Sequence, residues 1–167
     1  GIFGFVDESG IIQNLGVENI TVTGRDSVGG LVGLNDGGRV TNCYVTGTVS
    51  GSEDVGGLVG GNSGPKTACF WDIQTSGTAN GVGNQDPDPD GVIGLPTVDM
   101  QTLSTFTDAG WDFVGETANG TDDIWMMRTY PALLWDYTIG ISGTTTIALA
   151  KGRQGTIVFE VFNPDSY

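Results

Sequence analysis

The sequence predicts an all-β fold: a short parallel β-helix (β-solenoid) with an aromatic-rich C-terminal cap, one short helix and a C-terminal β-hairpin. Glycine supplies 29 of the 167 residues while hydrophobic residues still reach 38%, which indicates a folded chain with many tight turns. A glycine-rich pattern also recurs at intervals of 29 and 27 residues. The Val-, Ile-, Leu- and Thr-rich runs between the glycines have the length of strands, so each repeat can form one coil.

Composition and charge exclude several classes of function. Twenty acidic residues face six basic ones, and the net charge of −14 repels nucleic acids and anionic lipid headgroups. This favours cations, neutral sugars or copies of the chain as partners. The sequence contains no histidine, which excludes His-dependent catalytic triads and His-ligated zinc. Since no run of about 18 apolar residues occurs, we expect neither a membrane span nor a signal peptide.

The repeat occupies residues 1–72. Residues 1–5 align with 30–34 and 57–61, and the alignment continues downstream to the two cysteines. A period in the high twenties is too short for a propeller blade but suits one coil of two or three strands around a shared core. The glycine- and asparagine-rich residues 35–38 are expected to form a corner. The side chains predicted to face inward in the second coil are Val28, Leu31, Val40, Cys43, Val45 and Val49.

Two segments of the repeat carry a family resemblance. Asp-x-Val-Gly-Gly-Leu-Val-Gly-x-Asn at residues 26–35 and Thr-Asn-Cys-Tyr-Val-Thr-Gly-Thr-Val-Ser-Gly at 41–51 resemble the GLUG-motif repeats of bacterial surface proteins. Leucine-rich repeats have a similar period, but their Leu-x-x-Leu-x-Leu pattern is missing. The resemblance covers about residues 1–72 and implies an extracellular, adhesin-like scaffold. It carries over no catalytic residue.

Three further regions follow the repeats. Residues 73–94 are rich in Gly, Asn, Asp and Pro and are expected to form a loop. Residues 95–137 are predicted to be a cap over the last coil, with a short helix over residues 98–106 that Thr97 caps. Residues 138–167 are predicted to be a β-hairpin extension or the start of a truncated β-sandwich, and such a hairpin needs a neighbour to be stable. The aromatic residues that predict the cap are Trp111, Phe113, Trp125, Tyr130, Trp135 and Tyr137.

Two groups of side chains are candidate sites. Asp86, Asp88 and Asp90 alternate with prolines before a glycine, as in the first half of an EF-hand-type calcium loop, so bound Ca²⁺ is one expectation and a solvated acidic loop the other. The pattern departs at its twelfth position, which is Thr97 rather than a glutamate. Cys43 and Cys69 occupy equivalent repeat positions, and adjacent coils would place them within disulfide range or stack them as free thiols. We favour the free pair.

The predicted function is a structural, non-catalytic extracellular scaffold, a subunit or stalk segment of a surface fibre or adhesin. The chain begins inside a repeat, so its first coil would leave strand edges and apolar side chains uncovered. Copies of the chain, or flanking domains of a larger surface protein, could cover them head-to-tail. A monomeric glycan- or protein-binding module is the alternative, and a polysaccharide-active enzyme a weaker one. The residues predicted to carry assembly, including strand addition by the hairpin, are Ile2, Phe3, Phe5, Ile157, Phe159 and Val161.

Overall fold

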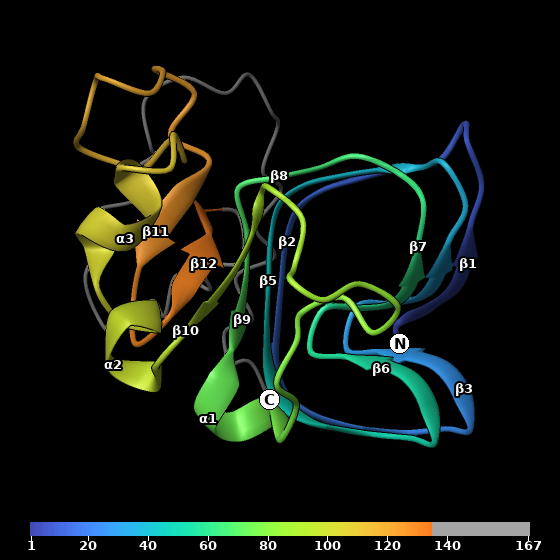
Figure 1. The fold of residues 1–167 in the computed structure, drawn as a ribbon. Helices are drawn as coiled ribbons and strands as arrows, with labels where there is room; N and C mark the ends of the chain where they lie inside the picture. Colours follow the sequence, from blue (N-terminus) through green and yellow to red (C-terminus); the bar gives the residue numbers. More distant parts are fainter. Residues whose placement is uncertain (135–167) are drawn as a thin grey trace, which may run out of the picture.

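The computed structural model describes residues 1–134, and these form a stack of three coils with a cap on its flank (Figure 1). The coils confirm the predicted β-solenoid. Coil 1 comprises β1 (Phe3–Val6), β2 (Ile11–Thr23) and β3 (Asp26–Gly29). Coil 2 comprises β4 (Val32–Asn35), β5 (Arg39–Ser50) and β6 (Glu53–Gly56). Coil 3 comprises β7 (Val59–Asn62), β8 (Lys66–Thr67) and β9 (Cys69–Asp72).

Equivalent residues of successive coils lie side by side in parallel sheets. Val32 pairs with Val59, and the Leu31 amide donates to the Leu58 carbonyl at 2.9 Å. All six side chains predicted to face inward in the second coil are buried, which confirms that prediction. The solenoid interior is therefore a continuous column of like side chains stacked along the axis.

A left-handed residue bends the long strand of each coil. Asn14, Asn42 and Ala68 occupy equivalent positions and have φ angles of 54°, 51° and 49°. Asparagine tolerates this conformation better than most residues because its short polar side chain can bond locally. The bend breaks the strand's alternation, so that Val40 and Cys43 on either side of Asn42 both point into the core.

Buried asparagines stack at the corner that follows β4 and β7. Asn35 Nδ2 donates to Asn62 Oδ1 at 2.9 Å and to the Gly38 carbonyl at 2.9 Å. Asn84 Oδ1 then accepts from the Asn62 backbone amide. The sequence analysis did not predict this ladder, which satisfies the backbone groups of a tight turn inside the protein.

Residues 73–94, predicted to be a loop, contain secondary structure. They contain α1 (Ile73–Ser76), and the segment then returns across the last coil, where Val82 bridges to Val59 in parallel. β10 (Val92–Leu95) pairs in parallel with β9 and extends the second sheet. The segment therefore supplies a partial fourth rung that closes one end of the solenoid.

The aromatic cap contains α2 (Thr97–Met100), α3 (Leu103–Thr107), β11 (Trp125–Met127) and β12 (Pro131–Leu133). The prediction that it covers the last coil is wrong. It packs on the outward face of the sheet that contains β2, β5 and β9, as Figure 1 shows. Tyr44 and Phe70 project outward from β5 and β9 into the same cluster as Trp111 and Trp125. These outward-facing aromatic side chains give the cap an apolar surface to pack against on the flank of the solenoid.

The single helix expected over residues 98–106 is two short helices. Thr97 does not cap α2, because its hydroxyl donates to Asp72 Oδ2 and its amide to Gln74 Oε1. The predicted C-terminal hairpin, with Ile157, Phe159 and Val161, lies outside the described residues, as do Trp135 and Tyr137. No helix of residues 1–134 is long and apolar enough to cross a membrane.

Candidate functional site

Coil 1 forms an open end of the solenoid. Ile2 occupies the row that continues as Leu31 and Leu58, yet Ile2 is 56% exposed while both leucines are 0% exposed. The next row behaves alike, with Phe3 at 38% exposure and its partner Val32 at 0%. These side chains have the right type and position for the core, but no rung of residues 1–134 covers them.

Backbone groups are also uncovered at this end. Among residues 1–134, β1, β2 and β3 are the edge strands of the three solenoid sheets, so each has one row of N–H and C=O groups without a sheet partner there. β2 alone spans residues 11–23. Two more apolar side chains, Phe5 and Ile11, are 58% and 65% exposed here. The structure thus places the predicted residues Ile2, Phe3 and Phe5 at this end. Ile11 lies there too, although its register partner in coil 2, Arg39, is itself exposed.

The opposite end is closed by the partial fourth rung. Asp88 accepts hydrogen bonds from the backbone amides of Gly81 and Val82, both at 2.8 Å, and so pins the closing segment over coil 3. Trp71 fills the core of that coil. A Cβ atom on Gly57 or Gly81 would collide with the Trp71 indole, so glycine is required at both positions for the ring to lie flat between them.

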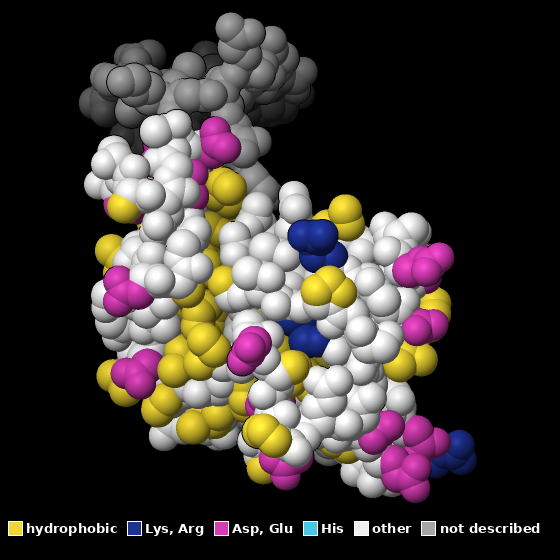
Figure 2. Space-filling model, turned by 45° about the horizontal axis from the view of Figure 1, so that its top comes forward, with side chains coloured by type: hydrophobic (Ala, Val, Ile, Leu, Met, Phe, Trp, Pro, Cys, Tyr) yellow, Lys and Arg dark blue, Asp and Glu magenta, His cyan; other side chains and the backbone are white. Residues whose placement is uncertain are grey.

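Hydrophobic side chains also gather along the junction between the solenoid and the cap, where Figure 2 shows them as a yellow band. Exposed apolar residues near the closed end come from α1, β10, α2 and α3, whose side chains are 41–66% exposed. These residues are Ile73, Ile93, Val98 and Leu103.

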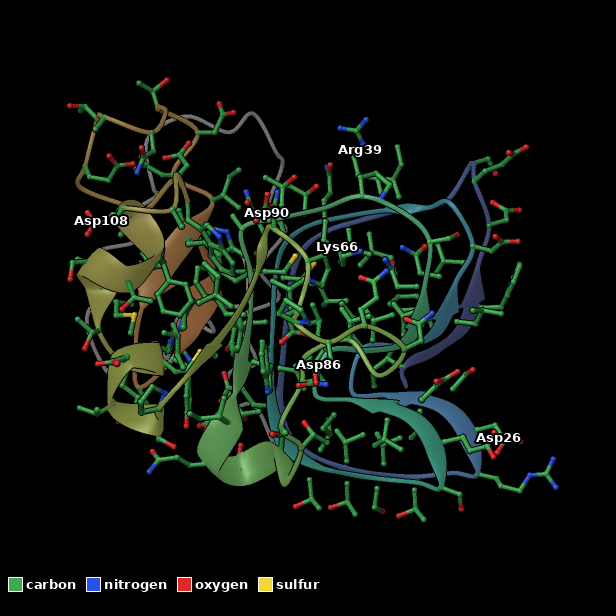
Figure 3. The ribbon with its side chains drawn as sticks, viewed as in Figure 1. Asp26, Arg39, Lys66, Asp86, Asp90 and Asp108 are labelled. Atoms are coloured by element: carbon green, nitrogen blue, oxygen red, sulfur yellow. The ribbon has the colours of Figure 1, made fainter. Side chains whose placement is uncertain are left out.

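The three candidate calcium ligands do not form a cluster. Both carboxylate oxygens of Asp88 bind backbone amides, whereas Asp86 and Asp90 are exposed and lie well apart in Figure 3. Within residues 1–134 no group of three or more Cys, Asp or Glu side chains is close enough to share a metal ion. Calcium binding therefore stays a prediction, and the role the geometry assigns to Asp88 is structural.

Cys43 and Cys69 are both buried and free, on neighbouring rungs. The Cys43 thiol donates to the Thr41 carbonyl at 3.2 Å, and the Cys69 thiol to the Thr67 carbonyl at 3.3 Å. The adjacent Cys69 thiol and burial together raise the pKa of Cys43 well above its ordinary value. Both side chains pack among the buried apolar residues of the solenoid core.

Lys66 occupies a core position of coil 3, in the row of Ile12 and Val40. Figure 3 shows it inside the ring of the coil, and its Nζ donates to the Gly64 carbonyl at 2.6 Å. Burial lowers the pKa of Lys66 from its ordinary value of 10.5. Among residues 1–134 no carboxylate lies within ion-pair distance of this ammonium group.

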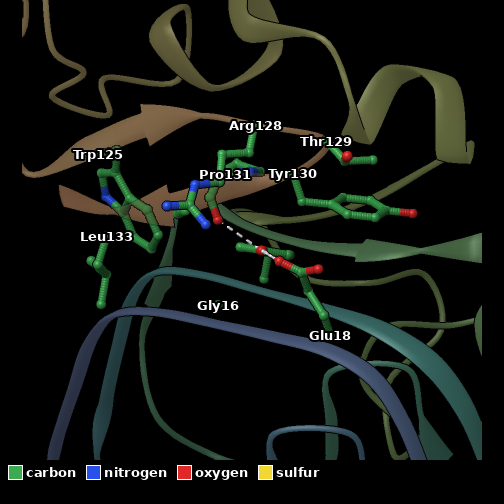
Figure 4. A pocket seen from close by; sticks show the side chains of 10 residues that line it. Gly16, Glu18, Trp125, Arg128, Thr129, Tyr130, Pro131 and Leu133 are labelled. Carbon is green, nitrogen blue, oxygen red and sulfur yellow. Dashed lines mark hydrogen bonds between the residues drawn. The ribbon is translucent and has the colours of Figure 1, made fainter. Parts of the chain in front are cut away.

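A pocket of about 320 Å³ lies between the solenoid flank and the β11–β12 hairpin (Figure 4). Gly16 and Glu18 of β2 and Tyr44 of β5 form one wall. A side chain at Gly16 would strike the Tyr44 ring, so glycine lets this ring lie against the backbone of β2. The hairpin contributes the other wall: Trp125, Arg128, Thr129, Tyr130, Pro131, Ala132 and Leu133.

Tyr44 fixes the geometry of this pocket. Its hydroxyl oxygen lies 2.6 Å from Glu18 Oε1 and 2.8 Å from the Pro131 carbonyl, so one proton is shared between a carboxylate and a backbone acceptor. Burial, together with the Glu18 carboxylate, raises the pKa of Tyr44 above its ordinary value, and the hydroxyl stays a donor. No sequence pattern reveals this site, because its residues come from segments more than 80 positions apart.

Comparison with known proteins identifies the repeat. A family model, the GLUG motif, matches residues 24–50, which include β3, β4 and β5 and thus one full turn of the solenoid. Searches of curated proteins and of solved structures gave no match. The matched turn pairs in register with equivalent strands of the turns before and after it. Residues 24–50 of the chain therefore form a GLUG motif, and this motif is one turn of a β-solenoid.

Proposed function

We propose that this protein is a structural, non-catalytic module of an extracellular fibre or adhesin, extended at its open end by a further parallel coil. The observation that carries the proposal is the row Ile2–Leu31–Leu58, in which identical core positions change from exposed to fully buried once a neighbouring rung is present. The GLUG motif and the solenoid fold are consistent with a repeat module of this kind. The acidic surface and the resemblance to bacterial surface repeats support the extracellular setting.

A further coil satisfies the open end better than an unrelated partner does. It supplies strands for all three uncovered edges at once, with the spacing and direction that β1, β2 and β3 already have. It also buries Ile2 and Phe3 in the rows to which they belong. A globular partner could bury the apolar side chains but would leave most of the backbone groups of three edges unpaired.

A second copy of the chain can supply part of this contact. β2 and β10 are the two edges of one parallel sheet, so a copy shifted along the axis meets β2 with its own β10 in the same direction. The closing segment covers the rest of that end, and β10 spans only residues 92–95. Copies should therefore associate more weakly than a full repeat placed before residue 1.

Size measurements over a concentration series test the proposal. The chain should form larger species as its concentration rises, measured by light scattering after gel filtration and by negative-stain microscopy. The double variant Phe5→Lys, Ile11→Lys places two charges on the open end without touching a buried group and should shift the chain to monomer. Val114→Lys, which changes a 49% exposed apolar residue on the cap, is the matched control and should associate like the wild type.

Two results would contradict the proposal. One is a chain that stays monomeric at every concentration and gains no stability when a consensus repeat is fused before residue 1. The other is association that the open-end variant leaves unchanged but Val114→Lys removes.

A further inference from the structure

The pocket between the solenoid flank and the hairpin has the lining of a small-molecule site. Its volume of about 320 Å³ lies at the lower end of the range of about 300–1,000 Å³ for ligand pockets. Figure 4 shows Glu18 on the solenoid side and Arg128 and Tyr130 on the hairpin side. Hydrogen-bonding groups and apolar surface therefore face one another across a space that suits a single ring.

The exposed part of the lining is mixed in chemistry. Glu18, Arg128 and Thr129 are exposed, whereas Tyr130, Ala132 and Leu133 are half-buried and provide apolar surface. A carboxylate accepts hydrogen bonds, a guanidinium donates them and a hydroxyl does both. A sugar ring presents the complementary pattern, with hydroxyl groups along its edge and C–H groups on its faces.

Charge restricts the class of sugar. Glu18 and Arg128 contribute opposite charges to the same pocket, so the lining has no net charge. The whole chain carries −14, which repels uronic and sialic acids before they reach the site. An uncharged hexose unit fits these conditions better than an acidic one does.

Two buried groups prepare the site. The Tyr44 hydroxyl holds Glu18 Oε1 at 2.6 Å, which orients the carboxylate toward the pocket before any ligand arrives. Trp125 is 1% exposed, and its buried ring forms part of the pocket wall.

From this lining we infer that the pocket binds one uncharged sugar residue of a glycan. Glu18 and Arg128 bind its hydroxyl groups, and Tyr130 packs against its ring. The pocket shares the edge strand β2 with the open end, through Gly16 and Glu18, but its other wall belongs to the hairpin.

Titration with defined sugars tests the inference. Maltose, cellobiose and lactose are added to the full chain, and binding is followed by NMR and by tryptophan fluorescence, since Trp125 lines the pocket. At least one neutral sugar should bind saturably and shift the resonances of Gly16, Thr129 and Ala132. Glu18→Gln and Arg128→Ala should each weaken that binding by about tenfold or more.

The controls use residues of the same type elsewhere on the surface. Glu8→Gln and Arg25→Ala change exposed side chains that do not line the pocket, and should bind sugar like the wild type. Thermal melts confirm that each variant is folded. The inference is overturned if no neutral sugar shifts the pocket resonances, if binding survives both pocket substitutions, or if only sialic acid or a zwitterion such as glycine binds there.

Discussion

The two ends of the solenoid contain the same repeat but differ in how their core is covered. At the open end Ile2 and Phe3 are exposed although their equivalents in coils 2 and 3 are buried. At the closed end Trp71 is 4% exposed, because Val82 and β10 continue the stack beyond it. The comparison shows that a repeat specifies which side chains point inward, while burial depends on a neighbouring rung.

The largest difference between the ends should appear when core residues are truncated. Trp71→Ala should lower the free energy of unfolding by about 3–5 kcal/mol, because it removes a large side chain enclosed by glycines and leaves a cavity. Ile2→Ala should change it by less than about 0.5 kcal/mol. Urea denaturation followed by tryptophan fluorescence and circular dichroism measures both, and equal losses would refute the distinction between the ends.

The closing segment itself is tested by its aspartates. Asp88→Ala should cost about 2–3 kcal/mol, because two buried backbone amides lose a charged acceptor. Asp86→Ala, which changes an exposed carboxylate, should cost less than about 0.5 kcal/mol. The same melts with calcium or with a chelator test the calcium prediction. A calcium-dependent rise in Tm that Asp86→Ala and Asp90→Ala abolish would show that the segment rearranges around an ion.

The smallest expected change in stability concerns Lys66. This residue places a charge in the core row that Ile12 and Val40 otherwise make apolar. Lys66→Met should raise stability at pH 7 by about 1 kcal/mol, because it removes a buried ammonium that has no carboxylate partner. Burial lowers the folded-state pKa, so the unfolded chain binds more protons between that pKa and 10.5. The free energy of unfolding of the wild type, relative to that of Lys66→Met, should therefore rise with pH in this window. If the difference between the two proteins does not change with pH, the ammonium group is solvated.

Sequence patterns predicted the solenoid because its period and its inward residues are local properties. The spacing of glycines and the alignment of the repeats were enough to place Val40, Cys43 and Val45 in the core. The cap was misplaced for the opposite reason. Tyr44 and Phe70 point outward, and no pattern within a repeat shows that aromatic residues 36 or more positions later will cover them.

The candidate sites divide in the same way. Ile2 and Phe3 could be predicted at the open end because their equivalents in the next coils are core residues, whereas Phe5 is exposed like its equivalent Leu34. The pocket could not, since Glu18 and Arg128 meet only after the cap docks on the flank. The aspartates of residues 86–90 were interpreted from their spacing, yet Asp88 is committed to the amides of Gly81 and Val82. Spacing in the sequence does not show which carboxylates already accept hydrogen bonds from backbone amides.

The bond network of Tyr44 has a mechanical consequence. A solenoid pulled along its axis opens by peeling one coil from the next, one rung at a time. Tyr44 stands on coil 2, but its hydroxyl contacts Glu18 on coil 1 and Pro131 on the hairpin. A force that peels β2 from β5 must therefore also break the bond between Tyr44 and Glu18 and the contacts of β12 with β2, so the flank shares a tensile load with the hydrogen bonds between the coils.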